Sequence, residues 1–179
     1  MKLLLHVCCA PDVTVALERL PEVERLALFF DNPNIHPPEE FARRWAALQQ
    51  VSCFASVVCL LGDYDPETWR QRVVGFETQP EGGERCRICI TYRLERTAEK
   101  AKELRFDTFA SVFTTSPHKN AELINTLGDE IAAAAGLTHL RLNFKKQAGF
   151  VRSVEISRQL GLYRQNYCGC VFSIKNKDQ

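Results

Sequence analysis

The sequence lacks any apolar run long enough to cross a membrane. Its longest apolar stretches are interrupted by charged residues well before the roughly 20 residues that a membrane-spanning helix requires. Residues 1–12, MKLLLHVCCAPD, also lack the length and the cleavage-site pattern of a signal peptide. We therefore expect a protein that stays in the cytoplasm and does not enter a membrane.

Clusters of glycine and proline are absent as well. The nine glycines and eight prolines are scattered along 179 residues, so no linker or low-complexity segment divides the chain. Hydrophobic residues make up 45% and charged residues 25%, which is typical of a globular protein and excludes a fibrous or disordered one. Because a chain of this length can bury a continuous core without disulfides, we expect a single domain over residues 1–179.

Histidine is scarce, whereas cysteine is abundant. The four histidines form no pair at a metal-binding spacing, but there are eight cysteines. A reducing compartment disfavours disulfides, so that the cysteines indicate metal binding or redox chemistry. Six of them form three close pairs, which are Cys8-Cys9, Cys86-x-x-Cys89 and Cys168-Gly169-Cys170. The remaining two, Cys53 and Cys59, lie in or beside an apolar run and are interpreted as small buried hydrophobic residues.

The three cysteine pairs differ in how well they suit chelation. Cys86 and Cys89 open a predicted helix, where both thiolates can face one centre, although the pair also suits a dithiol redox site. Gly169 allows the backbone to turn between its two cysteines. Neighbouring residues such as Cys8 and Cys9 point to opposite faces of an extended strand unless the chain turns, and Pro11 favours a turn.

Together the three pairs offer more ligands than one tetrahedral ion uses. Two adjacent centres, or one cluster with a second function, are therefore expected. Zinc is an alternative, but sulfur-rich surroundings also suit an iron–sulfur cluster. Asp12 is close enough to Cys8 and Cys9 to add an oxygen ligand, and it could equally be the N-cap of a helix over residues 13–20.

Apolar runs alternate with helical patterns along the chain. Strands are expected at residues 2–7, 25–30, 55–61 and 109–113, and helices at residues 13–20, from residue 38, at 67–74, from Cys86 to Leu104, from near Lys119 and at 153–160. This alternation predicts an α/β fold with a mostly parallel sheet and helices on both faces. Ligands bind beyond the carboxyl ends of such strands. The expected rim contains Cys8, Cys9 and residues 32–36, 63–65 and 115–118.

Positive charge is concentrated near the C-terminus. Residues 141–179 contain eight Lys/Arg against two Asp/Glu, a net charge of +6. This is either an ordinary solvated surface or a surface for a polyanion such as nucleic acid. Arginines near the CxxC could likewise contact phosphate, although Arg93 and Arg96 could instead form exposed ion pairs along a helix. His36 and His118 on the rim are candidate proton donors or surface residues.

The motifs together resemble a known family. These are LLHVCCAP, FFDNPNIHP, DYDPETW, GFETQPEGGERCRICITYRLERTA, SPHKN and FKKQAGFVRSVEISRQLGLYRQNYCGCVFS, spread over residues 3–173. The chain resembles the cobalamin-independent epoxyqueuosine reductases of the QueH family. The resemblance implies a Rossmann-like fold similar to the adenine-nucleotide α-hydrolase (HUP) group, and reduction of epoxyqueuosine to queuosine at the wobble position of tRNA. Many members carry a third cysteine where this sequence has Asp12.

These observations lead to one hypothesis for the site. Four of the paired cysteines hold a [4Fe-4S] cluster, while the other two, with catalytic Asp12, hold an adjacent mononuclear iron, and the partition among the pairs stays open. An electron donor of unidentified nature is also required. The alternatives are a zinc-stabilised RNA-binding module and a CxxC thiol–disulfide oxidoreductase. The residues expected to bind the tRNA substrate are Asn32, Asn34, His36, Arg85, His118, Lys119, Asn120 and Arg152.

Overall fold

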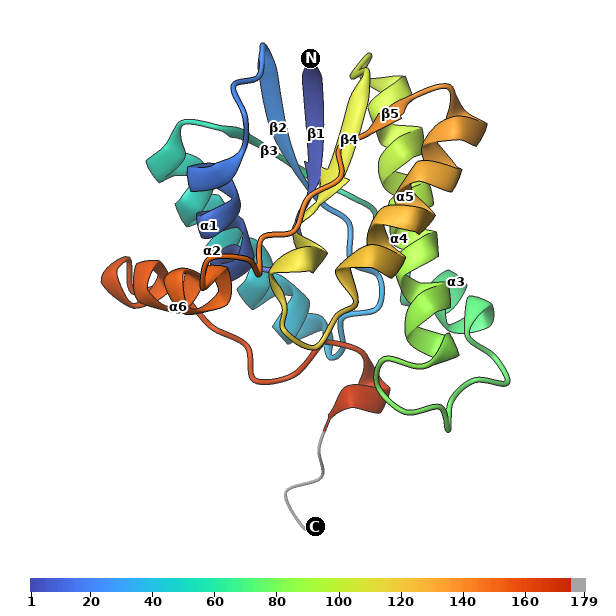
Figure 1. The fold of residues 1–179 in the computed structure, drawn as a ribbon. Coiled ribbons are helices and arrows are strands. Elements are labelled where there is room, and N and C mark those ends of the chain that lie inside the picture. Colours follow the sequence, from blue (N-terminus) through green and yellow to red (C-terminus); the bar gives the residue numbers. More distant parts are fainter. Residues whose placement is uncertain (175–179) are drawn as a thin grey trace.

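The computed structural model describes residues 1–174 and contains one five-stranded sheet. All strand pairs are parallel, and the strand order is β3-β2-β1-β4-β5. The carboxyl ends of the strands therefore lie along one edge of the sheet, at the bottom of Figure 1. The strands are β1 (Lys2–His6), β2 (Arg25–Phe30), β3 (Val58–Leu61), β4 (Thr108–Ser111) and β5 (Thr138–His139).

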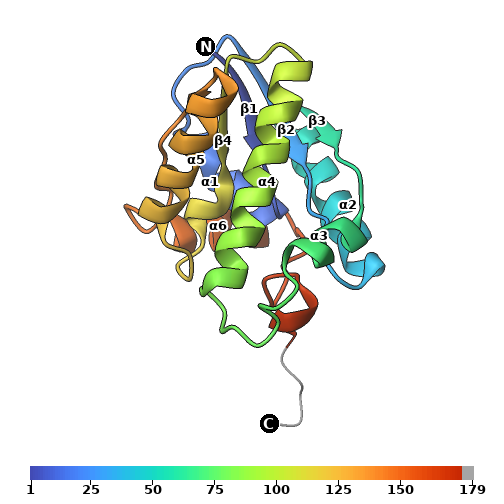
Figure 2. The same cartoon turned by 90° about the vertical axis from the view of Figure 1, so that its right-hand side faces the viewer.

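Helices cover both faces of the sheet, as expected for an α/β fold. Helices α1, α2 and α6 lie on one side, and α4 and α5 lie on the other (Figure 1). The short α3 lies beside the first turns of α4 in both views (Figures 1 and 2). The helices are α1 (Ala10–Arg19), α2 (Pro38–Ala55), α3 (Pro66–Arg72), α4 (Glu84–Glu103), α5 (Ala121–Ala135) and α6 (Gly149–Gln159).

Successive side chains of β1 point to opposite faces of the sheet, so this strand contributes to both apolar clusters of the core. Leu3 and Leu5 pack into the apolar cluster under α1 and α2, whereas Leu4 packs into the cluster under α4 and α5. All three side chains are fully buried. Burial on both faces explains why this strand is a continuous apolar run in the sequence.

Local sequence signals explain where several helices begin and end. Asp65 accepts a hydrogen bond from the backbone N–H of Thr68 and so caps α3, and Asn120 caps α5 in the same way. Gly136 ends α5 in the left-handed conformation that glycine adopts without strain. Pro38 at the start of α2 is followed by two acidic residues in the first turn, which favour the positive end of the helix dipole.

The strand order reverses at β1, because β2 and β3 lie on one side of it and β4 and β5 on the other. A crevice at the carboxyl end of a sheet forms at such a reversal, where the chain leaves neighbouring strands in opposite directions. The two segments at this point are the one after β1, which carries Cys8 and Cys9, and the 3₁₀ helix η1 (Val112–Thr115) after β4. The expectation of a ligand site on this rim thus agrees with the topology.

Several expected boundaries are wrong. Residues 55–57 are not part of a strand, because α2 continues to Ala55 and β3 begins at Val58. Cys53 is therefore on α2 and is exposed, contrary to its interpretation as a buried residue, while Cys59 is half-buried. The fourth strand ends at Ser111 and continues as η1, and the two-residue β5 was not expected at all. In residues 1–174, no helix combines the length and apolarity that crossing a membrane requires.

Candidate metal site

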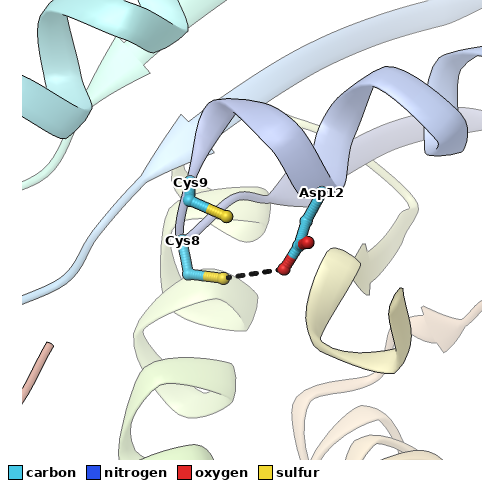
Figure 3. A group of neighbouring side chains, drawn as sticks. All are labelled: Cys8, Cys9 and Asp12. Carbon is cyan, nitrogen blue, oxygen red and sulfur yellow. Dashed lines mark hydrogen bonds between the residues drawn. The ribbon is translucent and has the colours of Figure 1, made fainter. Parts of the chain in front are cut away.

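Cys8, Cys9 and Asp12 form a compact group of metal-ligating side chains. One ligand atom from each lies within 4.8 Å of the others, and the Cys8 Sγ is 3.9 Å from Asp12 Oδ2 (Figure 3). Within residues 1–174, this is the one group of three or more Cys, His, Asp or Glu side chains that is close enough to hold a single ion. Two sulfurs and one carboxylate oxygen suit a transition metal such as iron or zinc.

The change from strand to helix brings the three side chains together. Cys9 has extended backbone angles and precedes the first residue of α1, and Asp12 follows in the first helical turn. The turn at Pro11 thus allows neighbouring cysteines to face the same point, as the sequence suggested. Asp12 is not the N-cap, because that position is occupied by Cys9. The positive end of α1 favours negative charge on these ligands.

Burial and mutual interaction shift the pKa values of this group. A hydrogen bond from Cys9 lowers the pKa of Cys8 to about 5 against the effect of burial, and the positive charges of Arg93, Lys119 and Arg44 add to this decrease. Its partner Cys9 has a raised pKa, because it donates that bond and is buried. Burial and the nearby charge of Cys8 raise the pKa of Asp12 to about 7. Cys8 is therefore the thiolate of the group, and a bound cation would also favour the ionised forms of Cys9 and Asp12.

The other four paired cysteines line a separate cavity of about 120 Å³. Cys86 and Cys89 lie in the first two turns of α4, and Cys168 and Cys170 lie in the C-terminal segment. Together they surround the cavity, but they are not close enough to chelate one ion. Ligands of a multi-iron cluster bind different atoms and so stand farther apart than ligands of one ion. This spacing fits a cluster better than a single zinc.

The CxC segment is held against the rest of the protein by specific contacts. The backbone N–H of His36 donates to the carbonyl of Gly169 at 2.8 Å. Buried Arg44 donates to the carbonyls of Cys168 and Tyr167 at 3.0 and 3.1 Å. Gly169 has φ of +123°, which a side chain would strain, so that glycine is required for the turn between the cysteines. The following 3₁₀ helix η2 (Val171–Ser173) lies beside α3 and the start of α4 (Figure 2).

A larger cavity of about 580 Å³ adjoins the metal-ligating residues. Cys8 and Asp12 line it, and Cys168, His118 and Lys119 line both this cavity and the smaller one. The two cavities thus share a wall. A volume of this size lies in the range of pockets that bind small molecules.

Lys119 provides positive charge between the two groups of ligands. Its Nζ lies 3.7 Å from Cys168 Sγ. Burial lowers the pKa of Lys119, but the negative charges of Cys168, Cys8 and Asp12 outweigh this effect and raise it well above the ordinary value. Lys119 is therefore a cation next to both sets of ligands.

Buried polar atoms without hydrogen-bond partners cluster around the smaller cavity. In residues 1–174, five buried side-chain nitrogen or oxygen atoms have no partner, and four of these belong to residues that line this cavity. Three are N–H donors, and such groups are costly to bury unless an acceptor is present. The donors thus fit a bound group that accepts hydrogen bonds, as the sulfurs of a cluster do. The four atoms are Asn34 Oδ1, Trp69 Nε1, Arg85 Nε and Arg93 Nε.

The structure brings most of the predicted substrate-binding residues to these cavities. Five of them line one or both, namely Asn34, Arg85, His118, Lys119 and Asn120. Three others do not. Asn32 is buried and bonded to the Val7 carbonyl, His36 holds the CxC segment through its backbone, and Arg152 pairs with Glu18 on the outer side of α1.

Sequence reasoning gave no role to two buried residues of the site and a wrong one to a third. Trp69, Arg44 and Arg93 are each at most 3% exposed. Trp69 and Arg93 lie in motifs of the family, but burial in the site could not be recognised from those motifs. Arg93 was considered for an exposed ion pair, but its guanidinium bonds to Asn32 and lies over the Phe113 ring. Arg96 pairs with Asp31 across the sheet edge instead of with a glutamate on its own helix.

The fold and the site together define an α/β protein with a candidate cysteine-rich metal site at the carboxyl edge of a parallel sheet. Comparison with known proteins identifies the family to which a protein with this fold and site belongs. The family model described as epoxyqueuosine reductase QueH matches residues 3–176. The chain is 46% identical to epoxyqueuosine reductase QueH of Streptococcus pyogenes serotype M1, covering 97% of this chain and 70% of the relative. It is 37% identical to that of Thermotoga maritima, covering 96% and 89%.

The chain therefore belongs to the epoxyqueuosine reductase family QueH, and it is an oxidoreductase. The resemblance noted in the sequence is confirmed over nearly its whole length. No observation in residues 1–174 favours the zinc-stabilised RNA-binding module or the thiol–disulfide oxidoreductase.

Proposed function

We propose that this protein reduces epoxyqueuosine in tRNA to queuosine, using an iron–sulfur cluster and an adjacent single iron. Family membership supports the reaction, because the relatives are named for it. The observation that carries the proposal for this chain is the Cys8–Cys9–Asp12 group, which lies at the wall of a 580 Å³ cavity beside a second, four-cysteine cavity. One reaction site next to one electron-transfer site is what this reduction needs.

The reaction sets the requirements for the site. Removing the epoxide oxygen breaks two C–O bonds and forms one C=C bond, and it consumes two electrons and two protons while releasing one water. When bound, the cluster would supply single electrons and the single iron would act as a Lewis acid toward the oxygen. The protein must hold both groups, place the substrate and supply protons.

The spacing of the ligands supports a division among the cysteines. Cys86, Cys89, Cys168 and Cys170 would hold the cluster, because they share a cavity lined by unpaired N–H donors. Cys8, Cys9 and Asp12 would hold the single iron, because their ligand atoms all lie within 4.8 Å of one another. Three protein ligands leave coordination positions open for a substrate atom.

Residues around the larger cavity have roles that follow from their positions. Lys119 stands beside Asp12 and Cys168 and can stabilise negative charge that develops on the substrate. His118 is exposed on the same wall and can exchange protons with water. The CxC segment closes one side of the cavity, and it is held there by Arg44, which donates to two of its carbonyls, and by the Tyr167 hydroxyl, which donates to the His36 carbonyl.

The tRNA would approach from the open side of this cavity. Arg164, Gln165 and Asn166 lie on its wall in the C-terminal segment, and exposed Phe150 lies there too. An arginine can contact phosphate, amides can bond to base edges, and an exposed aromatic ring can stack on an unpaired base. Such contacts suit a single-stranded anticodon loop.

Anaerobic purification tests the metal content and the reaction. We expect acid-labile sulfide and more iron than a [4Fe-4S] cluster alone contains, and turnover of tRNA containing epoxyqueuosine. A protein that holds only zinc and no sulfide, or one that binds the cluster but leaves this tRNA unchanged, would contradict the proposal.

Substituting Asp12 tests the division of ligands. Asp12→Ala should reduce turnover by at least about a hundredfold and lower the iron content by about one atom, because an oxygen ligand of the single iron is lost. The visible absorption of the cluster should remain. Asp63→Ala is the matched control, since Asp63 follows β3 on the same rim, is exposed and lines neither cavity. Loss of the cluster absorption in Asp12→Ala, with the control intact, would refute this division.

A further inference from the structure

The smaller cavity is surrounded by buried hydrogen-bond donors that the four cysteine ligands do not account for. The Nε1 of Trp69 and the Nε atoms of Arg85 and Arg93 are buried, and none of them makes a hydrogen bond of normal geometry within residues 1–174. All three residues are at most 3% exposed and line the same cavity as the four cysteines. A buried donor without an acceptor destabilises the folded protein, because it has lost its hydrogen bonds to water. Three of them around one cavity indicate that a bound group accepts their bonds.

Two of these donors also carry positive charge without a carboxylate partner. In the described part of the chain, neither Arg85 nor Arg93 takes part in an ion pair with Asp or Glu. Arg85 donates to the carbonyls of Glu77 and Gln79 and lies over the Phe172 ring. A buried guanidinium normally has a counter-charge close by. Here the anionic group would be the thiolates and whatever they bind.

The polar edge of Trp69 lies toward this anionic group, because its N–H acts on the Cys89 thiol and opposes the rise that burial causes in the pKa of that thiol. Trp69 lies on α3 and packs with Cys89 from α4 and with Cys170 and Phe172 from the C-terminal segment. Its ring centroid is 6.2 Å from that of Phe172. Indole has one polar group, an N–H that only donates. Its apolar part is thus satisfied by packing, while its one donor is left for a ligand of the cavity.

We propose that Trp69, Arg85 and Arg93 donate hydrogen bonds to the sulfurs of the cluster held by the four cysteines and thereby raise its reduction potential. This inference rests on the proposed function. Reduction adds an electron to a group that already carries negative charge, so N–H dipoles and buried cations stabilise the reduced form more than the oxidised form. These residues tune and position the cluster, and for Arg85 this role takes the place of the substrate contact expected from the sequence.

Trp69→Phe is the sharpest test, because it removes the N–H and keeps an aromatic ring in the same packing. Trp45→Phe is the matched control: Trp45 is the other tryptophan in the chain, lies on α2 and packs on Phe30 of β2, and it does not line the cluster cavity. The reduction potential is measured on the anaerobic holoenzyme by a redox titration followed by EPR and visible absorption. Iron and sulfide are counted in each protein.

We expect Trp69→Phe to keep its iron and sulfide and to have a lower reduction potential than the wild type, whereas Trp45→Phe keeps the wild-type value. A potential that is equal in Trp69→Phe and Trp45→Phe would overturn the inference while leaving the proposed function intact. Absence of a cluster from the wild-type protein would instead refute the proposed function, so the two failures are distinguishable.

A second variant covers the case in which Trp69→Phe assembles less cluster. Arg93→Lys keeps the buried positive charge but removes the Nε donor and the planar guanidinium. We expect a lower potential in this variant too, at unchanged sulfide content. A wild-type potential in Arg93→Lys would overturn the inference.

Discussion

At the scale of single residues, buried polar side chains depend on their surroundings for stability as well as function. His139 shows this away from the metal-binding residues. Its side chain is buried against Phe109 and lies 3.0 Å from Asp129 Oδ1. Burial lowers the pKa of His139 below the ordinary value of 6.5, although the hydrogen bond to Asp129 acts in the opposite direction. The unfolded chain therefore takes up a proton at this residue before the folded protein does.

His139 should make stability depend on pH. Its folded pKa is below its unfolded pKa, so its stabilising contribution is complete above about pH 6.5 and is lost as the pH falls toward the folded pKa. We expect the thermal unfolding midpoint of the wild type to fall more between pH 7.5 and pH 5.5 than that of His139→Gln, which cannot be protonated there. Equal decreases in the two proteins would contradict this assignment.

At the scale of elements, helix α6 depends on one close approach of backbones. Gly149 opens this helix, and a Cβ built there would lie 1.6 Å from the Phe144 carbonyl oxygen and 2.6 Å from Arg19 Nη1. Arg19 of α1 in turn donates to carbonyls of the loop that precedes α6. Since α6 packs mainly on α1, this junction determines how the C-terminal segment meets the rest of the fold.

Gly149→Ala should therefore destabilise the protein strongly. The backbone must move to admit the methyl group, which costs about 1–3 kcal/mol for an overpacked site. The free energy of unfolding, from denaturant titration, measures this loss. Val151→Ala is the control in the same helix, because Val151 is 55% exposed and its truncation should change stability by about 0.5 kcal/mol or less. Similar losses in the two variants would show that the close approach does not matter.

At the scale of the whole molecule, part of the excess positive charge near the C-terminus is compensated by acidic residues elsewhere in the fold. Arg141 pairs with Asp129 and Glu122, and Arg152 pairs with Glu18 and Glu155. Three charged residues of the segment, Lys175, Lys177 and Asp178, lie outside the described residues. Arg164 has no ion pair within residues 1–174 and lines the larger cavity. It is therefore the best placed of these cations for a tRNA phosphate.

Two arginine substitutions should distinguish an arginine that binds tRNA phosphate from one whose charge is compensated by nearby carboxylates. Arg164→Gln should weaken binding of epoxyqueuosine-containing tRNA by roughly threefold to tenfold, and it should reduce the slope of log K against log salt by about 0.7–1, as expected for one lost phosphate contact. Arg152→Gln should change both quantities little, because acidic neighbours already compensate its charge. Filter binding across a salt series measures both. Binding that is independent of salt would argue against phosphate contacts altogether.

Much of the fold could be predicted from local pattern. Hydrophobic periodicity and turn residues placed four of the five strands, and β2 matches residue for residue. The two-residue β5 was missed because it is too short to show a period, and its strand pairing depends on β4. The start of β3 was wrong because helix α2 continues through residues with no strong breaker until Ser56 adopts a left-handed conformation.

The sequence by itself determined the candidate chemistry, because three cysteine pairs and Asp12 indicate metal binding or redox chemistry whatever the fold. Only the tertiary structure decided how these ligands group. It joined Cys8, Cys9 and Asp12 through one helix turn, and it placed four cysteines that lie up to 84 residues apart in the chain around another cavity. It also buried Trp69 and Arg93 beside them. The physical reason is that ligand type is a property of each residue, whereas the distances between ligands depend on the packing of elements that are remote in sequence.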